Sequence, residues 1–197
     1  MEQPSTFIVD MDYERRELRR NRTIILSGDI DCGISYQFIE DMHLLLLDKE
    51  SKEPITVIIS SGGGDVFSGN AIIRSIRQAQ KAGLVVIGDV YGHACSMAFF
   101  IVQCCDERRM GRLCSQMAHG VTTGFHGDIK NLDAEKKLLD YWHHEFAHIV
   151  ADRCNTKENC DDWNEPGFWH EILRDNTPQW YNSEECLEMG LVDEIYD

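Results

Sequence analysis

The sequence contains no long hydrophobic segment. Its longest nearly apolar stretch covers only residues 94–102, far short of the roughly 20 residues that a membrane-spanning helix needs. The first 20 residues are polar and charged, and they lack the apolar centre of a secretory signal peptide. We therefore expect a soluble, cytoplasmic protein that does not bind membranes.

Basic residues are scarce, and the cysteines follow no recognisable spacing. Nineteen Lys and Arg stand against 34 Asp and Glu, which gives a formal net charge of −15. A chain with this charge repels phosphate backbones, so we predict no nucleic-acid partner. The eight cysteines are scattered irregularly in a chain without an export signal, which argues against a disulfide framework. They include no C-x-x-C pair, which argues against a thiolate zinc site. We expect free thiols and no cofactor.

Short apolar runs alternate with helical patterns along the chain, and no internal repeat or low-complexity linker interrupts them. Helical spacing of apolar residues marks residues 35–48 and a second helix that begins near Val66. Runs rich in β-branched residues, bounded by Gly, Asp or Pro, predict buried strands at residues 23–26, 55–59 and 84–90. This alternation predicts an α/β fold with parallel strands in a single domain, residues 1–197.

Two segments of candidate chemistry follow predicted strands. Crossovers between parallel strands are right-handed, so the carboxyl ends of the strands and the amino ends of the following helices converge at one edge of the sheet. The first segment is Ser60-Ser61-Gly62-Gly63-Gly64-Asp65. Its glycines allow a close backbone approach and its amides favour negative charge, which suits an oxyanion hole. A tight strand-to-helix turn with Asp65 as the N-terminal cap is the structural alternative.

The second segment is Gly92-His93-Ala94-Cys95-Ser96-Met97-Ala98. It joins an apolar strand to an apolar helix and places Ser96 where that helix begins. Such a turn exposes the hydroxyl and directs the backbone N–H of Met97 to the same place. A serine in this position is also a common helix cap, so the segment alone leaves both interpretations open.

A serine nucleophile needs a base to remove its proton, and the base needs an orienting group. His119 lies in a predicted extended stretch 23 residues after Ser96, and Asp175 lies in Leu173-Arg174-Asp175-Asn176. Spacing alone does not select these two from the other histidines and carboxylates.

The ordered motifs resemble those of Clp proteolytic subunits. They are Ser61-Gly62-Gly63-Gly64, Gly92 to Met97, Met117-Ala118-His119, Arg174-Asp175 and Glu188-Met189-Gly190-Leu191-Val192-Asp193. The resemblance implies the ClpP/crotonase fold, with repeated β-β-α/β-α units and a protruding handle strand and helix. The handle helix is expected at residues 129–153, and a flexible N-terminal segment is expected at residues 1–18. It also implies a Ser96, His119 and Asp175 triad and an oxyanion hole formed by the amides of Gly63 and Met97.

The same resemblance implies a serine endopeptidase that hydrolyses unfolded polypeptides inside an oligomeric chamber. The expected assembly is a homo-oligomer of stacked rings, with an AAA+ unfoldase as a partner. Peptide substrates are expected to bind as an added strand with loose sequence selectivity.

A competing motif occurs at residues 144–148, which read His-Glu-Phe-Ala-His. In this HExxH pattern, His144 and His148 would bind zinc and Glu145 would activate water. The same helix carries an apolar stripe, so the two histidines also suit its solvated flank. A crotonase-like acyl-CoA enzyme and a catalytically silent ring subunit are further alternatives, although the pairing of Ser96 with His119 argues against acyl-CoA chemistry.

Overall fold

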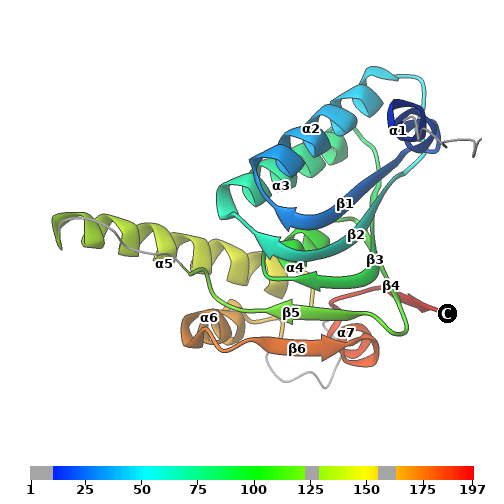
Figure 1. The fold of residues 1–197 in the computed structure, drawn as a ribbon. Helices are drawn as coiled ribbons and strands as arrows, with labels where there is room; N and C mark the ends of the chain where they lie inside the picture. The colour runs from blue at the N-terminus through cyan, green and yellow to red at the C-terminus, as the bar shows by residue number, and fades with distance from the viewer. Residues whose placement is uncertain (1–10, 123–128, 155–162) are drawn as a thin grey trace, which may run out of the picture.

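The computed structural model describes residues 11–122, 129–154 and 163–197, which fold around one mixed sheet (Figure 1). In chain order the elements are α1 (Met11–Arg20), β1 (Thr23–Ile30), α2 (Cys32–Leu47), β2 (Ile55–Gly64), α3 (Val66–Lys81), β3 (Val86–Cys95), α4 (Met97–Gln103), β4 (Glu107–Gly111), β5 (Ser115–Ala118), α5 (Ile129–Ala151), α6 (Pro166–Asp175), β6 (Gln179–Asn182), α7 (Ser183–Met189) and β7 (Glu194–Tyr196). The α/β prediction is confirmed.

The sheet is parallel through its centre and branches at one strand. The main path runs β1-β2-β3-β4-β7, and β5 also pairs with β3 and carries β6 at its outer side. All these pairs are parallel except β5 with β6. Because β3 pairs with both β4 and β5, its carboxyl end meets β5 directly. The branch therefore places the end of β3 beside β5, which follows it in the chain only after α4 and β4.

The observed strands extend beyond the predicted ones into the glycine-rich and serine segments. Gly64 pairs with Ile30 of β1, and Ser61 pairs with Ala94 of β3, each beyond a register shift. The expected turn at the glycine run is therefore the distorted end of β2. Pairing with two neighbouring strands stabilises extended backbone there, which local glycine content did not predict.

Helices α2 and α3 lie together on one side of the sheet, and α5 projects away from the body (Figure 1). Helix α4 is buried along its whole length, because its sequence is apolar on every face. The base of α5 joins this core, where the Phe146 ring stacks on that of Phe100 with centroids 4.3 Å apart. Helix α5 occupies most of the segment predicted as the handle helix, residues 129–153.

The predicted flexible segment at residues 1–18 includes residues that form part of α1. Two guanidinium groups of this helix, from Arg15 and Arg19, each lie 2.9 Å from a carboxylate oxygen of Asp41 on α2. Asp41 is largely buried in this arrangement, so the ion pairs fasten α1 to α2. Residues 11–18 are thus helical and paired with α2, residues 1–10 lie outside the described residues, and the flexibility of the segment at residues 1–18 stays a prediction.

The cysteines within the described ranges carry thiols that form no disulfide with one another, as predicted: Cys32, Cys95, Cys104, Cys105, Cys114, Cys154 and Cys186. Cys160 lies outside the described residues. None of the described helices is long and apolar enough to cross a membrane.

Candidate active site

Ser96 lies at a sharp junction between β3 and α4. Its backbone has φ 54° and ψ −122°, a conformation that side-chain-bearing residues rarely adopt. The side chain of Ser96 makes no capping hydrogen bond to α4. The hydroxyl therefore does not serve as a helix cap, which was the alternative interpretation. Such backbone strain costs about 1–3 kcal/mol and concentrates at functional sites. The conformation holds the hydroxyl at the carboxyl end of β3.

The branch in the sheet positions His119 beside this junction. The backbone N–H of Ser96 donates to the carbonyl of Met117 on β5 at 2.8 Å, and His119 follows two residues later. Ser96 and His119 are both half-buried and line one cavity of about 50 Å³. The two side chains share the cavity without a direct hydrogen bond, a separation that commonly closes only when substrate is bound.

His119 is oriented through its Nδ1 atom. This nitrogen lies 2.6 Å from the carbonyl oxygen of Gly120 and 3.4 Å from Oδ1 of Asn176. A carbonyl oxygen only accepts hydrogen bonds, so Nδ1 carries the proton and Nε2 has the free lone pair. The imidazole is therefore held in the form in which Nε2 is available as a base.

Asp175, the predicted third member of the triad, does not contact His119. Its side chain is exposed and forms no hydrogen bond or ion pair with any other part of the described chain. Asn176 occupies the position beside Nδ1 instead. Sequence analysis missed Asn176 because the family motif emphasises the adjacent carboxylate, and only the backbone at the end of α6 decides which side chain turns toward His119.

Gly63 is the glycine of the run that approaches the serine junction. Gly63 is buried with φ 95°, and a Cβ atom there would lie 2.7 Å from Cβ of Ser96 and 3.0 Å from the nitrogen of Met97. Only glycine permits this approach. The N–H of Gly63 donates to Oγ of Ser61 at 3.1 Å, and that hydroxyl donates to the carbonyl of Gly28 at 2.6 Å.

Gly64 and Met97 both line the cavity with Ser96. Of the two predicted oxyanion donors, Met97 is thus adjacent to the cavity, whereas the amide of Gly63 is already bonded to Ser61. The next glycine of the run was not selected from the sequence. The direction of each amide depends on the Ser61 hydrogen bond and on the register shift in β2, which a run of glycines does not reveal.

Asp65 and Cys95 lie next to the candidate site in the sequence, and the structure explains both without a catalytic role. Asp65 caps α3 as the alternative proposed, accepting from the backbone N–H and the hydroxyl of Ser68 at 2.8 and 2.7 Å. The hydrogen bond from that hydroxyl is the main reason that the pKa of Asp65 is lowered. Cys95 precedes the candidate nucleophile, but burial raises the pKa of its thiol. A protonated thiol is a weak nucleophile, so Ser96 is a better candidate for the nucleophile than Cys95.

The HExxH residues lie on a different part of α5. The rings of His144 and His148 are adjacent, with centroids 4.5 Å apart, and both side chains are exposed together with that of Glu145. Among the residues that the structure describes, no group of three or more His, Cys, Asp or Glu is arranged to hold a metal ion. Within the described part of the chain, the motif therefore supplies a pair of imidazoles without the third protein ligand that a catalytic zinc site requires.

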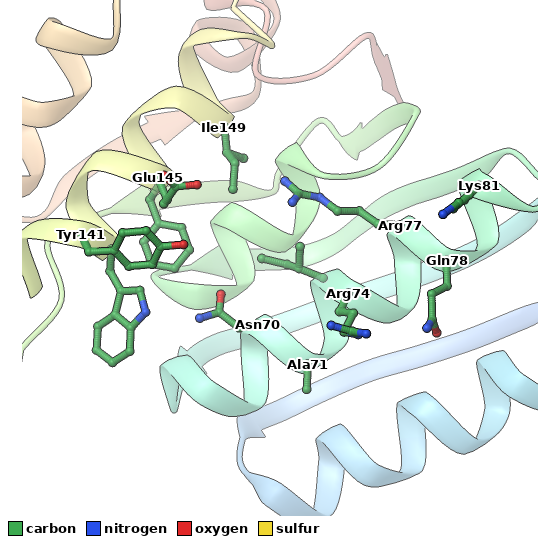
Figure 2. Close-up of a pocket in the computed structure, with 12 residues that line it drawn as sticks. Asn70, Ala71, Arg74, Arg77, Gln78, Lys81, Tyr141, Glu145 and Ile149 are labelled. Atoms are coloured by element: carbon green, nitrogen blue, oxygen red, sulfur yellow. The ribbon is translucent and has the colours of Figure 1, made fainter. Parts of the chain in front are cut away.

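Glu145 instead faces a large groove between α3 and α5 (Figure 2). The groove has a volume of about 720 Å³ and does not include Ser96 or His119. Three basic residues, Arg74, Arg77 and Lys81, follow one another along its α3 side. Its size alone does not make it the site of chemistry, because it lacks a nucleophile with a paired base.

A third cavity adjoins the one at Ser96. It has a volume of about 320 Å³ and shares Gly64, Val66, Val121 and Thr122 with the smaller cavity. Phe67 and Trp142 form part of its wall, in an edge-to-face contact with centroids 5.1 Å apart. The apolar wall next to the candidate nucleophile is suited to a substrate side chain.

The branched, mainly parallel sheet and the projecting helix are those of the ClpP/crotonase-like fold. A family model described as Clp protease matches residues 10–197. The chain belongs to this family and is a Clp-type serine peptidase.

Relatives similar to this chain include three proteins named as ATP-dependent Clp protease proteolytic subunits. Subunit 2 of Treponema denticola is 28% identical over 189 residues, covering 94% of this chain and 87% of its own length. Subunit 2 of Borreliella burgdorferi is 25% identical over 187 residues, covering 94% and 88% respectively. The subunit of Deinococcus radiodurans is 26% identical over 184 residues, covering 91% and 82%.

Proposed function

We propose that this chain is a serine endopeptidase in which Ser96 is the nucleophile and His119 is its general base. The observation that carries the proposal is the pairing of β3 with β5. This pairing places Ser96 and His119 at one cavity. Ser96 has a strained backbone and makes no capping hydrogen bond, and Nδ1 of His119 is hydrogen-bonded to a carbonyl oxygen. This combination supplies both an exposed hydroxyl and a base that can remove its proton.

In the proposed reaction, Oγ of Ser96 attacks the carbonyl carbon of a peptide bond while Nε2 of His119 takes the hydroxyl proton. The tetrahedral intermediate collapses to an acyl-enzyme, and His119 returns the proton to the leaving amine. Water then attacks the ester, again with His119 as base, and releases the carboxylic acid and free Ser96. Nδ1 keeps its proton throughout.

The oxyanion of each tetrahedral intermediate needs two donors. We assign one to the backbone N–H of Met97, as the sequence predicts, and the other to Gly64. Two observations support Gly64 over Gly63: Gly64 lines the same cavity as Ser96, and the amide of Gly63 already donates to Ser61. Gly63 contributes by allowing the glycine strand to approach the nucleophile.

An extended peptide is the substrate form that suits this site. The carboxyl end of β2 and the segment after β5 flank the cavity, and an extended chain placed between them gains main-chain hydrogen bonds that do not depend on sequence. The adjoining cavity of about 320 Å³ would accept one apolar side chain. Unfolded polypeptides meet these requirements, and folded proteins do not.

We further propose that copies of the chain assemble into closed, stacked rings that enclose the active sites. Family membership favours such an assembly, and the groove between α3 and α5 has the chemistry of an interface, because Tyr141 and Trp142 line it together with basic residues of α3. A chain with net charge −15 offers many acidic partners for those bases on a second copy. The similar proteins are named as ATP-dependent, which favours an AAA+ unfoldase as the partner that supplies unfolded chains.

A fluorophosphonate probe tests the catalytic proposal directly, because it reacts covalently with activated serine hydroxyls. The native chain should be labelled at Ser96, Ser96→Ala should not be labelled, and Ser115→Ala on the neighbouring strand should react like the native chain. Labelling and peptide hydrolysis should both survive treatment with a metal chelator. Labelling that persists in Ser96→Ala would reject the assignment.

A further inference from the structure

Asp175 and Asn176, at the end of α6, place their side chains in different surroundings. Asn176 is the C-terminal cap of this helix in the left-handed conformation, with φ 58° and ψ 14°, and its N–H donates to the carbonyl of Ile172 at 3.2 Å. Asparagine tolerates this conformation better than most residues with a side chain. The reversal directs the Asn176 amide to His119, while Asp175, the last residue of α6, remains exposed to solvent.

The amide of Asn176 faces the nitrogen of His119 that does not act as the base. Nδ1 donates mainly to the carbonyl of Gly120 at 2.6 Å and lies 3.4 Å from Oδ1 of Asn176. Asn replacing an aspartate is damaging in other serine peptidases because the amide can stabilise the wrong imidazole tautomer. Here the Gly120 carbonyl already requires a proton on Nδ1, so a neutral amide is compatible with a basic Nε2.

From this geometry we propose that Asn176 is the positioning residue for His119, so that the protein uses a neutral Ser-His-Asn arrangement in place of a Ser-His-Asp triad. The inference rests on the proposed function. It assigns to Asp175 no part in catalysis. Because an amide carries no charge, it orients the ring but gives less stabilisation to the imidazolium that forms during the reaction than a carboxylate would.

A purely structural role for Asn176 is the competing explanation, since asparagine is a common helix cap in the left-handed region. Glycine separates the two roles. Asn176→Gly keeps the backbone conformation at no steric cost and removes only the side chain. A capping role therefore predicts unchanged activity in Asn176→Gly, whereas a positioning role predicts a slower reaction in a protein that is at least as stable.

The experiment measures peptide hydrolysis by the assembled full-length protein across pH, with thermal unfolding of each variant. Asn176→Gly should lower kcat about tenfold with little change in KM, equivalent to one neutral hydrogen bond of about 1.4 kcal/mol. Asn176→Asp should restore and exceed the native kcat, and it should move the acidic limb of the pH profile to higher pH, because a carboxylate favours the imidazolium. Asp175→Asn, the matched neighbour, should leave kcat and the pH profile unchanged.

Two results would overturn the inference while leaving the serine peptidase intact. One is native activity in Asn176→Gly, and the other is loss of activity in Asp175→Asn with a shifted pH profile; in both cases Ser96 would still react with the fluorophosphonate probe. If Ser96 does not react with the probe in any variant, the proposed function itself fails. The labelling and the pH profile therefore separate the two failures.

Discussion

The backbone N–H of Ser96 donates a hydrogen bond to the carbonyl of Met117 at 2.8 Å, which ties the end of β3 to β5. This bond fixes the candidate nucleophile relative to the strand that leads into His119. Each residue directly follows the carboxyl end of its strand, and both side chains line the cavity and lie outside the hydrophobic core. Loss of either side chain should therefore affect chemistry much more than folding.

Ser96→Ala and His119→Ala should each reduce kcat for peptide hydrolysis by at least about 10³-fold, with thermal unfolding close to that of the native chain. The two residues act as one unit, so the double variant should be hardly slower than either single variant. Steady-state kinetics with a fluorogenic peptide provide the measurement.

The HExxH residues supply the matched controls for this experiment. His148→Ala, Glu145→Gln and a chelator should leave hydrolysis nearly unchanged, because the exposed pair His144 and His148 takes no part in the proposed reaction. Should chelation or Glu145→Gln silence the protein while Ser96→Ala remains active, the zinc peptidase alternative would replace the serine mechanism.

The strained backbone of Ser96 gives a second prediction, which concerns stability. At φ 54° glycine is relaxed, whereas alanine retains the strain. Relief of about 1–3 kcal/mol of strain, less the cost of a more flexible unfolded chain, should make Ser96→Gly roughly 1 kcal/mol more stable than Ser96→Ala. Denaturant unfolding of both variants, each inactive, measures the difference. A less stable Ser96→Gly would show that the junction stores no strain.

The sequence predicted the elements that depend on local patterns. The strand run at residues 55–59, the helix beginning at Val66 and the position of Ser96 before an apolar helix all match the structure. Periodicity and β-branched composition indicate which side chains are buried. These elements were predictable because each of them packs buried side chains into the core. The order of motifs in the chain supplied His119, which spacing alone did not.

The residues that the sequence did not predict depend on tertiary contacts. Gly64 lies at the cavity because β2 continues through the glycine run and pairs with β1. Asn176 faces His119 because α6 ends in a left-handed residue at that point. A carboxylate in the adjacent position is the stronger signal in a sequence, although its side chain is directed to solvent. The same limitation applies to α1, where ion pairs to Asp41 stabilise a segment that looks flexible by itself.

His143 gives a prediction about pH. Its Nε2 accepts a hydrogen bond from the N–H of Val121 at 3.0 Å, next to the His119 segment. Burial, and then the positive neighbours His170 and Arg174, lower its pKa below the usual 6.5 despite the opposing carboxylate of Asp140. Below about pH 6.5, His143 therefore binds a proton more readily in the unfolded chain than in the folded chain. Protonation of Nε2 also removes the acceptor of the Val121 hydrogen bond.

Stability should be full above about pH 6.5 and should fall as the pH drops through the window between that value and the lower folded-state pKa of His143. His143→Gln should flatten this dependence, since its amide oxygen still accepts from Val121 but does not titrate. The exposed neighbour His144→Gln is the control and should keep the native dependence. Thermal unfolding between pH 5 and pH 8 provides the measurement, and identical slopes for the native chain and His143→Gln would contradict the assignment.

The groove between α3 and α5 gives the last prediction, which concerns assembly. Arg74 and Lys81 are exposed on one face of α3 in a strongly acidic protein. If a second copy covers this groove with acidic residues, Arg74→Glu with Lys81→Glu should convert attraction into repulsion and dissociate the particle. Lys49→Glu with Lys52→Glu makes the same change in net charge on a separate exposed loop, and it should leave assembly intact.

Sedimentation velocity at micromolar concentration, at low and high salt, should show a large particle for the native chain and for the control variant, and smaller species for the groove variant. High salt should weaken the native assembly, because it screens attraction between partly exposed charges. Peptidase activity toward a short peptide should fall less than assembly if each chain carries its own Ser96 and His119. A native chain that stays monomeric and cleaves folded proteins freely would contradict the enclosed chamber. A groove variant that assembles like the control would show that the rings form through another surface.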